Sequence, residues 1–232
     1  MLDMKAIGIA VRITARITAL VVLCAGAASA QKPETTLQRA VAAYMGAETV
    51  SVTFDQTVTN PLTDRAAQSH GELLRKRPNL LSITFSSPAA DRIVADGTDL
   101  WVYLPSSAPG QVIKMPAAGQ QGMLLDPLGQ ILSAPIDRYS VTAAGTANVS
   151  GRGTHAVKLT PKSQRELFTS ATLWIDDADG AVRRIETTEP SGLLRRVTIT
   201  QLRKNMSIPR SAFRFTRPAN TRVIDQRSMF GG

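Results

Sequence analysis

The chain has 232 residues and a formal net charge of +9; 43% of its residues are hydrophobic and only 5% are aromatic. This length suits one domain or two small ones, and the hydrophobic content excludes a globally disordered chain and predicts an aliphatic core. The basic character would suit DNA, an acidic partner or anionic lipid head groups, and the predicted export signal argues against DNA.

The first thirty residues predict a cleaved secretory signal peptide. Three basic residues precede an apolar run at residues 17–28, which is shorter than the ~20 residues that span a bilayer. The segment ends in "ASA", so we expect cleavage after Ala30 and a single domain over residues 31–232; an uncleaved anchor is the alternative. Cys24 lies in this segment, so the mature chain would have no cysteine and a charge of +7, from 24 basic and 17 acidic residues.

Residues 32–48 predict a helix, because Leu37, Ala40, Val41 and Tyr44 share one face at helical spacing. A proline suits its first turn and a glycine suits its end.

Alternation of apolar and polar residues follows and predicts strands. It begins at residues 50–58 and continues in "SHGELLRK" and "NLLSITF". Asp96 and Gly97 form a strong turn signal between "RIVA" and "LWVYL", which predicts a hairpin, and "GQVIKM" is expected to pair back. After a break, alternation returns in "RYSVTAA", "HAVKLTP", "FTSATLWID", "VRRIETTE", "LRRVTITQLRK" and "FRFT".

The break itself, "GQQGMLLDPLGQILSAP", predicts one or two short amphipathic helices. The pattern as a whole predicts a mainly β chain with some α-helix. We expect about ten or eleven antiparallel strands in one strongly curved sheet, with helices on its concave face.

Residues for catalysis or metal binding are scarce. Neither His70 nor His155 stands in a metal-ligand spacing, and no nucleophile or nucleotide-binding motif is present. We therefore predict no catalytic residue, no metal, no cofactor and no enzymatic activity. Trp101 and Tyr103 share one face of a strand, where they could form core packing or contact a ligand.

Several stretches, in this order, resemble the periplasmic outer-membrane lipoprotein carrier family, the LolA-type chaperones. They are "VTFDQTV", "GELLRKRPNLLSITFSSP", "DRIVADGTDLWVYLPSSAPGQV", "KLTPK" and "RVIDQR", and they cover nearly the whole mature chain. The resemblance implies an incomplete antiparallel β-barrel with a helical lid over a hydrophobic cavity.

The resemblance also implies the cargo and the partners. The family carries acylated lipoproteins from an inner-membrane lipoprotein-releasing ABC transporter to an outer-membrane lipoprotein receptor. We therefore expect a monomer in the periplasm that binds no nucleic acid. The alternative is a related module that senses lipids or lipoproteins in envelope signalling.

The resemblance gives Arg77 a particular role, because the family's arginine before proline and asparagine sits at the cavity mouth and hydrogen-bonds the lid. Leu81 and Ile83 stand where the family commonly has aromatic residues, the first of which contacts the releasing complex. The residues that we predict for the cavity and lid are Arg77, Phe54, Leu81, Ile83, Phe85, Trp101, Tyr103, Met123, Leu124, Leu128, Ile131, Leu132 and Trp174.

Overall fold

The computed structural model describes residues 32–117, 127–134, 136–163 and 166–226. The predicted signal peptide, Cys24, Met123 and Leu124 lie outside the described residues. Within the described ranges, no helix has the length and apolarity needed to cross a membrane.

The described residues form two α-helices, two 3-10 turns and twelve strands. The helical segments are α1 (Pro33–Met45), α2 (Pro127–Ser133), η1 (Ile136–Arg138) and η2 (Arg210–Phe213). The strands are β1 (Thr49–Asn60), β2 (Arg65–Lys76), β3 (Leu80–Ser87), β4 (Arg92–Asp96), β5 (Asp99–Tyr103), β6 (Gln111–Pro116), β7 (Tyr139–Val149), β8 (Arg152–Pro161), β9 (Ser170–Asp176), β10 (Val182–Thr188), β11 (Leu194–Lys204) and β12 (Arg222–Asp225).

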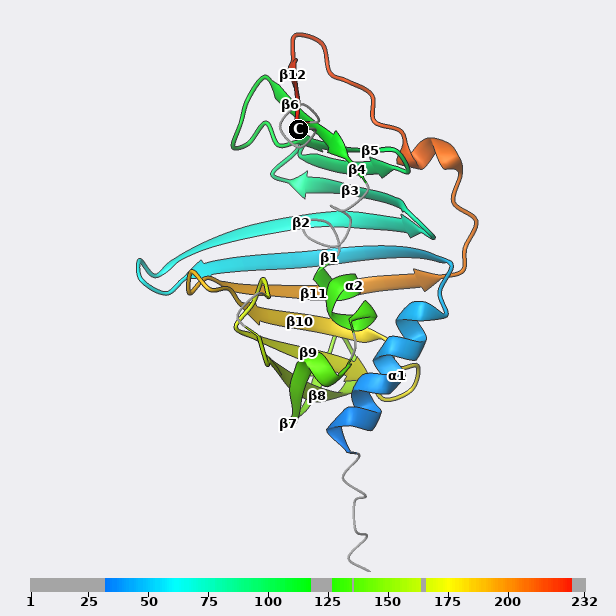
Figure 1. Cartoon of the computed structure of the whole chain (residues 1–232), viewed down its shortest axis with the longest axis vertical. Helices are drawn as coiled ribbons and strands as arrows, with labels where there is room; N and C mark the ends of the chain where they lie inside the picture. Colours follow the sequence, from blue (N-terminus) through cyan, green and yellow to red (C-terminus); the bar gives the residue numbers. More distant parts are fainter. Residues whose placement is uncertain (1–31, 118–126, 135, 164–165, 227–232) are drawn as a thin grey trace, which may run out of the picture. The chain divides into compact units, whose positions relative to one another are not determined.

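All twelve strands belong to one sheet, in the order β12-β6-β5-β4-β3-β2-β1-β11-β10-β9-β8-β7 (Figure 1). Two antiparallel meanders, β1 to β6 and β7 to β11, join where β1 pairs with β11. The end strands β12 and β7 are not neighbours, so the sheet stays open and does not close into a barrel. This confirms the predicted incomplete antiparallel barrel.

The strand count and the C-terminal segment need correction. The sequence predicted ten or eleven strands and placed the last one at "FRFT", but Phe213 ends η2 and residues 214–218 have no regular structure. Phe213 is buried with Leu80 and Ile208, so this segment packs across the sheet and adds no strand to it. The strand missed was β12, whose four residues are too few for a clear alternation and pair parallel to β6.

Two hydrophobic clusters lie on the face of the sheet that the helices cover. The first joins Leu37 of α1 and Leu132 of α2 to the buried side chains of β7 to β10. The second gathers side chains of β1 to β6, including Phe54, Leu81 and Ile83. Val197 of β11 touches both clusters, which places β11 and β1 between them.

Gly71 shapes the second cluster. Phe54 lies directly across from it on β1, and a Cβ atom at residue 71 would come within 2.9 Å of the Phe54 ring. The missing side chain lets this ring lie over the sheet and meet Phe85 edge-on, with 5.8 Å between ring centroids. Glycine at this position therefore serves close packing.

Candidate functional site

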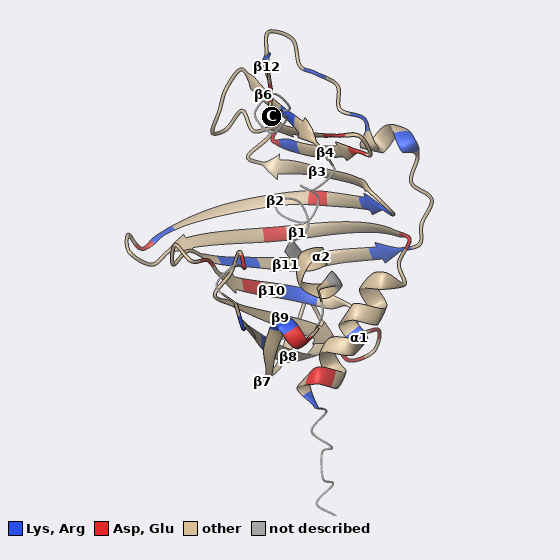
Figure 2. Ribbon diagram, in the orientation of Figure 1, with Lys and Arg blue, Asp and Glu red and all other residues tan. Residues whose placement is uncertain are grey.

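A cavity of about 530 Å³ lies between the two clusters. Alternate residues of β1, β2, β3, β10 and β11 form one wall, because successive side chains of a strand point to opposite faces. Helices α1 and α2 line the opposite side, together with loop residues such as Leu167 and Phe168, and α2 carries no charged residue (Figure 2). The volume falls within the ~300–1,000 Å³ typical of ligand pockets, and a mostly apolar lining suits an aliphatic ligand.

Six of the predicted cavity residues line this space, from two strands and one helix. They are Phe54, Ile83, Phe85, Leu128, Ile131 and Leu132. Leu81 has the same orientation as Ile83 but is buried in the second cluster, opposite Arg75 on β2, and does not line the cavity.

Three predicted aromatic residues lie away from the cavity. Trp101 alternates with the buried Leu100, so its ring points to the other face, where it stacks on Phe215 at 5.3 Å. Tyr103 has the same orientation as Trp101 and also meets Phe215. Trp174 alternates with core residues of β9 and lies beneath Arg184. The sequence allowed either packing or ligand contact for Trp101 and Tyr103, and these ring contacts are packing contacts.

Arg77 reaches the end of α1, because its Nη1 atom donates a hydrogen bond to the carbonyl oxygen of Met45, the last residue of that helix. The last carbonyls of a helix have no partner within the helix, and a guanidinium offers five N–H donors. Arg77 does not line the cavity itself.

Arg75 is a second arginine at the same helix end, and it does line the cavity. Its Nη2 atom donates to the carbonyl oxygens of Tyr44 and Ala47, both at 3.2 Å. Its guanidinium also lies 4.0 Å from the centre of the Tyr44 ring, a cation–π contact. The residue is only 9% exposed. Arg75 therefore joins β2 to α1 from inside the cavity.

Arg75 was not among the cavity residues predicted from the sequence. A cation in a strand normally marks the solvent side, and here the helix end supplies the carbonyls that make its burial possible. The wall made by Val182, Ile185 and Val197 was not predicted either. Alternation along β10 and β11 was the available signal, but alternation does not tell which face of a strand lines a cavity.

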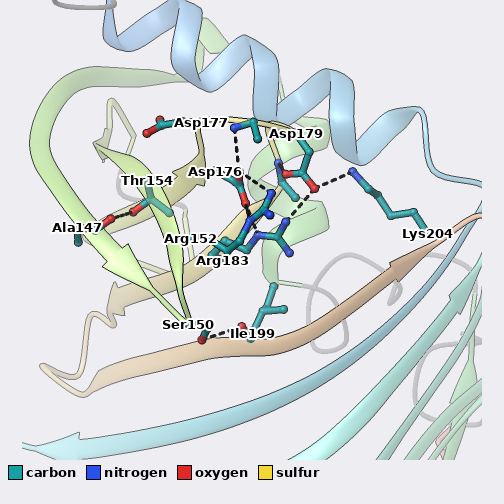
Figure 3. A network of polar contacts seen from close by, with 12 residues as sticks. Ala147, Ser150, Arg152, Thr154, Asp176, Asp177, Asp179, Arg183, Ile199 and Lys204 are labelled. Carbon is teal, nitrogen blue, oxygen red and sulfur yellow. Dashed lines mark hydrogen bonds and ion pairs between the residues drawn. The ribbon is translucent and has the colours of Figure 1, made fainter.

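The turn between β9 and β10 carries a network of ion pairs, in which Asp176 and Asp179 bind Arg152, Arg183 and Lys204 (Figure 3), and the middle of α1 contacts the same turn. Arg39 of α1 donates to the carbonyl oxygen of Asp177 at 2.7 Å. The adjacent Asp176, only 1% exposed, accepts hydrogen bonds from Arg152 Nε at 2.6 Å and from Arg183 Nε at 2.8 Å. Burial alone would raise the pKa of Asp176, but bonds from Arg152, the Ala178 amide and Arg183 hold that pKa well below its usual value.

The described residues contain no group of three or more acidic, histidine or cysteine side chains placed to hold a metal ion. His70 and His155 each contact one aspartate, Asp55 at 2.6 Å and Asp177 at 2.5 Å respectively. Both pairs are about half exposed, and neither histidine lines the cavity.

Known proteins of similar sequence and fold match most of the chain. Residues 45–216 match the model of the family "Outer membrane lipoprotein carrier protein LolA". An outer-membrane lipoprotein carrier protein of Serratia proteamaculans (strain 568) is 30% identical over 176 residues, which are 75% of this chain and 80% of that protein.

Two solved structures share the fold at low sequence identity. An uncharacterized conserved protein of Thermus thermophilus superposes with a TM-score of 0.53 at 13% identity, over 83% of this chain and 98% of that one. MucB superposes with a TM-score of 0.51 at 16% identity, over 79% of this chain and 62% of that one. The open sheet, its helix-covered face and the family match over residues 45–216 agree: the chain belongs to the outer membrane lipoprotein carrier protein LolA family.

Proposed function

We propose that this protein is a periplasmic carrier that shelters the acyl chains of lipoproteins in its cavity. The observation that carries the proposal is the apolar space of about 530 Å³ between the sheet and its two helices. Each methylene removed from water contributes ~0.8 kcal/mol, so a chain of about sixteen carbons would cost roughly 12 kcal/mol to leave in water. A carrier needs only this shelter, and no bond has to form or break.

The carrier also has to release what it holds, and the end of α1 offers a means. Arg75 and Arg77 both donate hydrogen bonds to backbone carbonyl oxygens at the C-terminal end of α1. These contacts favour a closed, empty cavity, since an acyl chain that pushes α1 outward would have to break them. We assign Arg77 the role of a latch, so that closure helps to expel the cargo toward an acceptor.

The expected partners follow from this role. An inner-membrane lipoprotein-releasing ABC transporter would load the carrier, and an outer-membrane lipoprotein receptor would unload it. The carrier would act as a monomer, because one chain forms the whole cavity.

The direct test is a two-step transfer assay with the purified mature chain. Spheroplasts that hold a labelled acylated lipoprotein are incubated with the chain, and the soluble fraction is then mixed with outer-membrane vesicles. We expect the label to become soluble in complex with the chain and then to enter the vesicles. No soluble complex would refute the carrier role, and a complex that passes nothing on would instead favour the sensing module.

The variant Arg77→Leu tests the latch in the same assay. A hydrogen bond to a charged group contributes about 1.5–3 kcal/mol, so losing it should slow release about ten- to a hundredfold while loading continues. Arg65→Leu, at the far end of β2, is the control and should behave like the wild type. Normal release by Arg77→Leu would remove the latch from the mechanism.

A further inference from the structure

One end of the cavity is polar. Its lining there includes Gln56, Thr187, Glu189 and Arg195. Arg195 Nε and Nη2 donate to Glu189 Oε1 at 3.3 and 2.9 Å, and its Nη1 donates to Gln56 Oε1 at 3.1 Å. Gln56 Nε2 in turn donates to Ser69 Oγ at 3.0 Å. A chain of hydrogen bonds thus runs from β2 through β1 and β11 to the turn after β10.

This polar end is open to solvent. The side chains of Arg195 and Glu189 are 34% and 27% exposed. The other cations in the described lining are engaged elsewhere: Arg75 is buried on the carbonyls at the end of α1, and Lys204 contacts Asp179 at 3.5 Å. A ligand with an apolar tail and a polar head can therefore keep its head in water where Arg195 and Glu189 lie.

We infer that Gln56, Glu189 and Arg195 form a binding site for the uncharged ester or amide neck of an acyl chain and disfavour anionic heads. The inference rests on the proposed acyl-binding cavity and names the class of ligand that it takes. Of the five N–H donors of Arg195, three serve Glu189 and Gln56 among the described residues. The guanidinium can thus also donate to a carbonyl oxygen that enters from the cavity.

The charge of Glu189 provides the selectivity. The Glu189 carboxylate pairs with Arg195 and neutralises its charge. In the described lining, Arg195 is the only cation next to Glu189, so a carboxylate or phosphate head that approached Arg195 would also come close to the Glu189 carboxylate. Like charges brought together at an interface are strongly unfavourable. A neutral ester or amide meets no such repulsion, and it finds both donors and acceptors in the cluster.

The test compares two ligands with the same twelve-carbon chain at pH 8, laurate and monolauroylglycerol, by calorimetric titration of the full mature chain. The measured quantity is the ratio of their dissociation constants. Glu189→Gln leaves Arg195 without its carboxylate, so we expect laurate to gain at least about tenfold relative to the ester, equivalent to about 1.4 kcal/mol. Arg195→Gln should shift the ratio in the opposite direction, which decides the matter if the first variant fails to fold.

Glu186→Gln is the matched control. Glu186 lies on β10, three residues before Glu189, and pairs with Arg196 at 2.5 Å without lining the cavity. Its ratio should equal that of the wild type. The inference would be overturned if the ratio of dissociation constants for Glu189→Gln lay within about twofold of this control, or if Arg195→Gln did not shift the ratio in the opposite direction. Either result would leave the proposed acyl-binding cavity untouched. A wild type that binds neither ligand would overturn the acyl-binding cavity as well.

Discussion

Replacing Val52 by tryptophan is expected to weaken binding of an acylated lipopeptide about fifty- to two-hundredfold. Val52 extends from β1 into the cavity and packs with the second cluster. An indole there would displace about three or four methylenes of the acyl chain, and each contributes ~0.8 kcal/mol. The measurement is the dissociation constant of a fluorescent lipopeptide.

Thr53→Trp is the control for this prediction. Thr53 is the next residue on the same strand, is exposed and points to the opposite face, so its substitution leaves the cavity unchanged. Equal affinity of the two tryptophan variants would mean that the acyl chain binds elsewhere.

The largest expected effect on stability belongs to Asp176→Asn, which should lower the free energy of unfolding at pH 7 by about 3 kcal/mol. Asp176 is 1% exposed and accepts bonds from Arg152 and Arg183. Removing one partner of a buried ion pair leaves the other charge uncompensated, which commonly costs about 3–5 kcal/mol. Urea unfolding of the purified chain gives the value.

The loss of stability in Asp176→Asn should depend on pH. The folded-state pKa of Asp176 lies below the ~3.9 of an unfolded aspartate, so its stabilisation is complete above that value and is lost as pH falls through the folded-state pKa. The gap between wild type and Asp176→Asn should therefore narrow below about pH 4. Asp177→Asn, at a half-exposed ion pair with His155, should cost less than about 1 kcal/mol at any pH. A gap that stays constant from pH 7 to pH 3 would contradict the assignment of the charge to Asp176.

Much of the fold could be predicted from the sequence because its local signals are clear. The helical spacing of Leu37 and Ala40 predicted α1, and both residues are buried in the first cluster. The Asp96-Gly97 turn predicted the hairpin of β4 and β5. A helix and a hairpin depend on residues that are close together in the chain, so the spacing of residues along the sequence is enough to predict them.

The site was less predictable because it depends on residues far apart in the chain. Arg75 meets the end of α1 about thirty residues away, and Arg195 meets Gln56 across 139 positions. Trp101 and Trp174 were predicted to line the cavity, but each alternates with buried core residues and therefore lies on the other face of its strand. Pairing register decides such contacts, and a single sequence does not specify it.

The central claim is that acyl chains lie between the two hydrophobic clusters. The most direct measurement is photo-crosslinking with a lipopeptide that carries a diazirine in the middle of its acyl chain, followed by mass spectrometry of the labelled peptides. The claim predicts labels on both walls of the cavity, at Val52 and Leu73 on one side and Ile185 on the other. Labels confined to the opposite face, around Trp101 and Phe215, would contradict it.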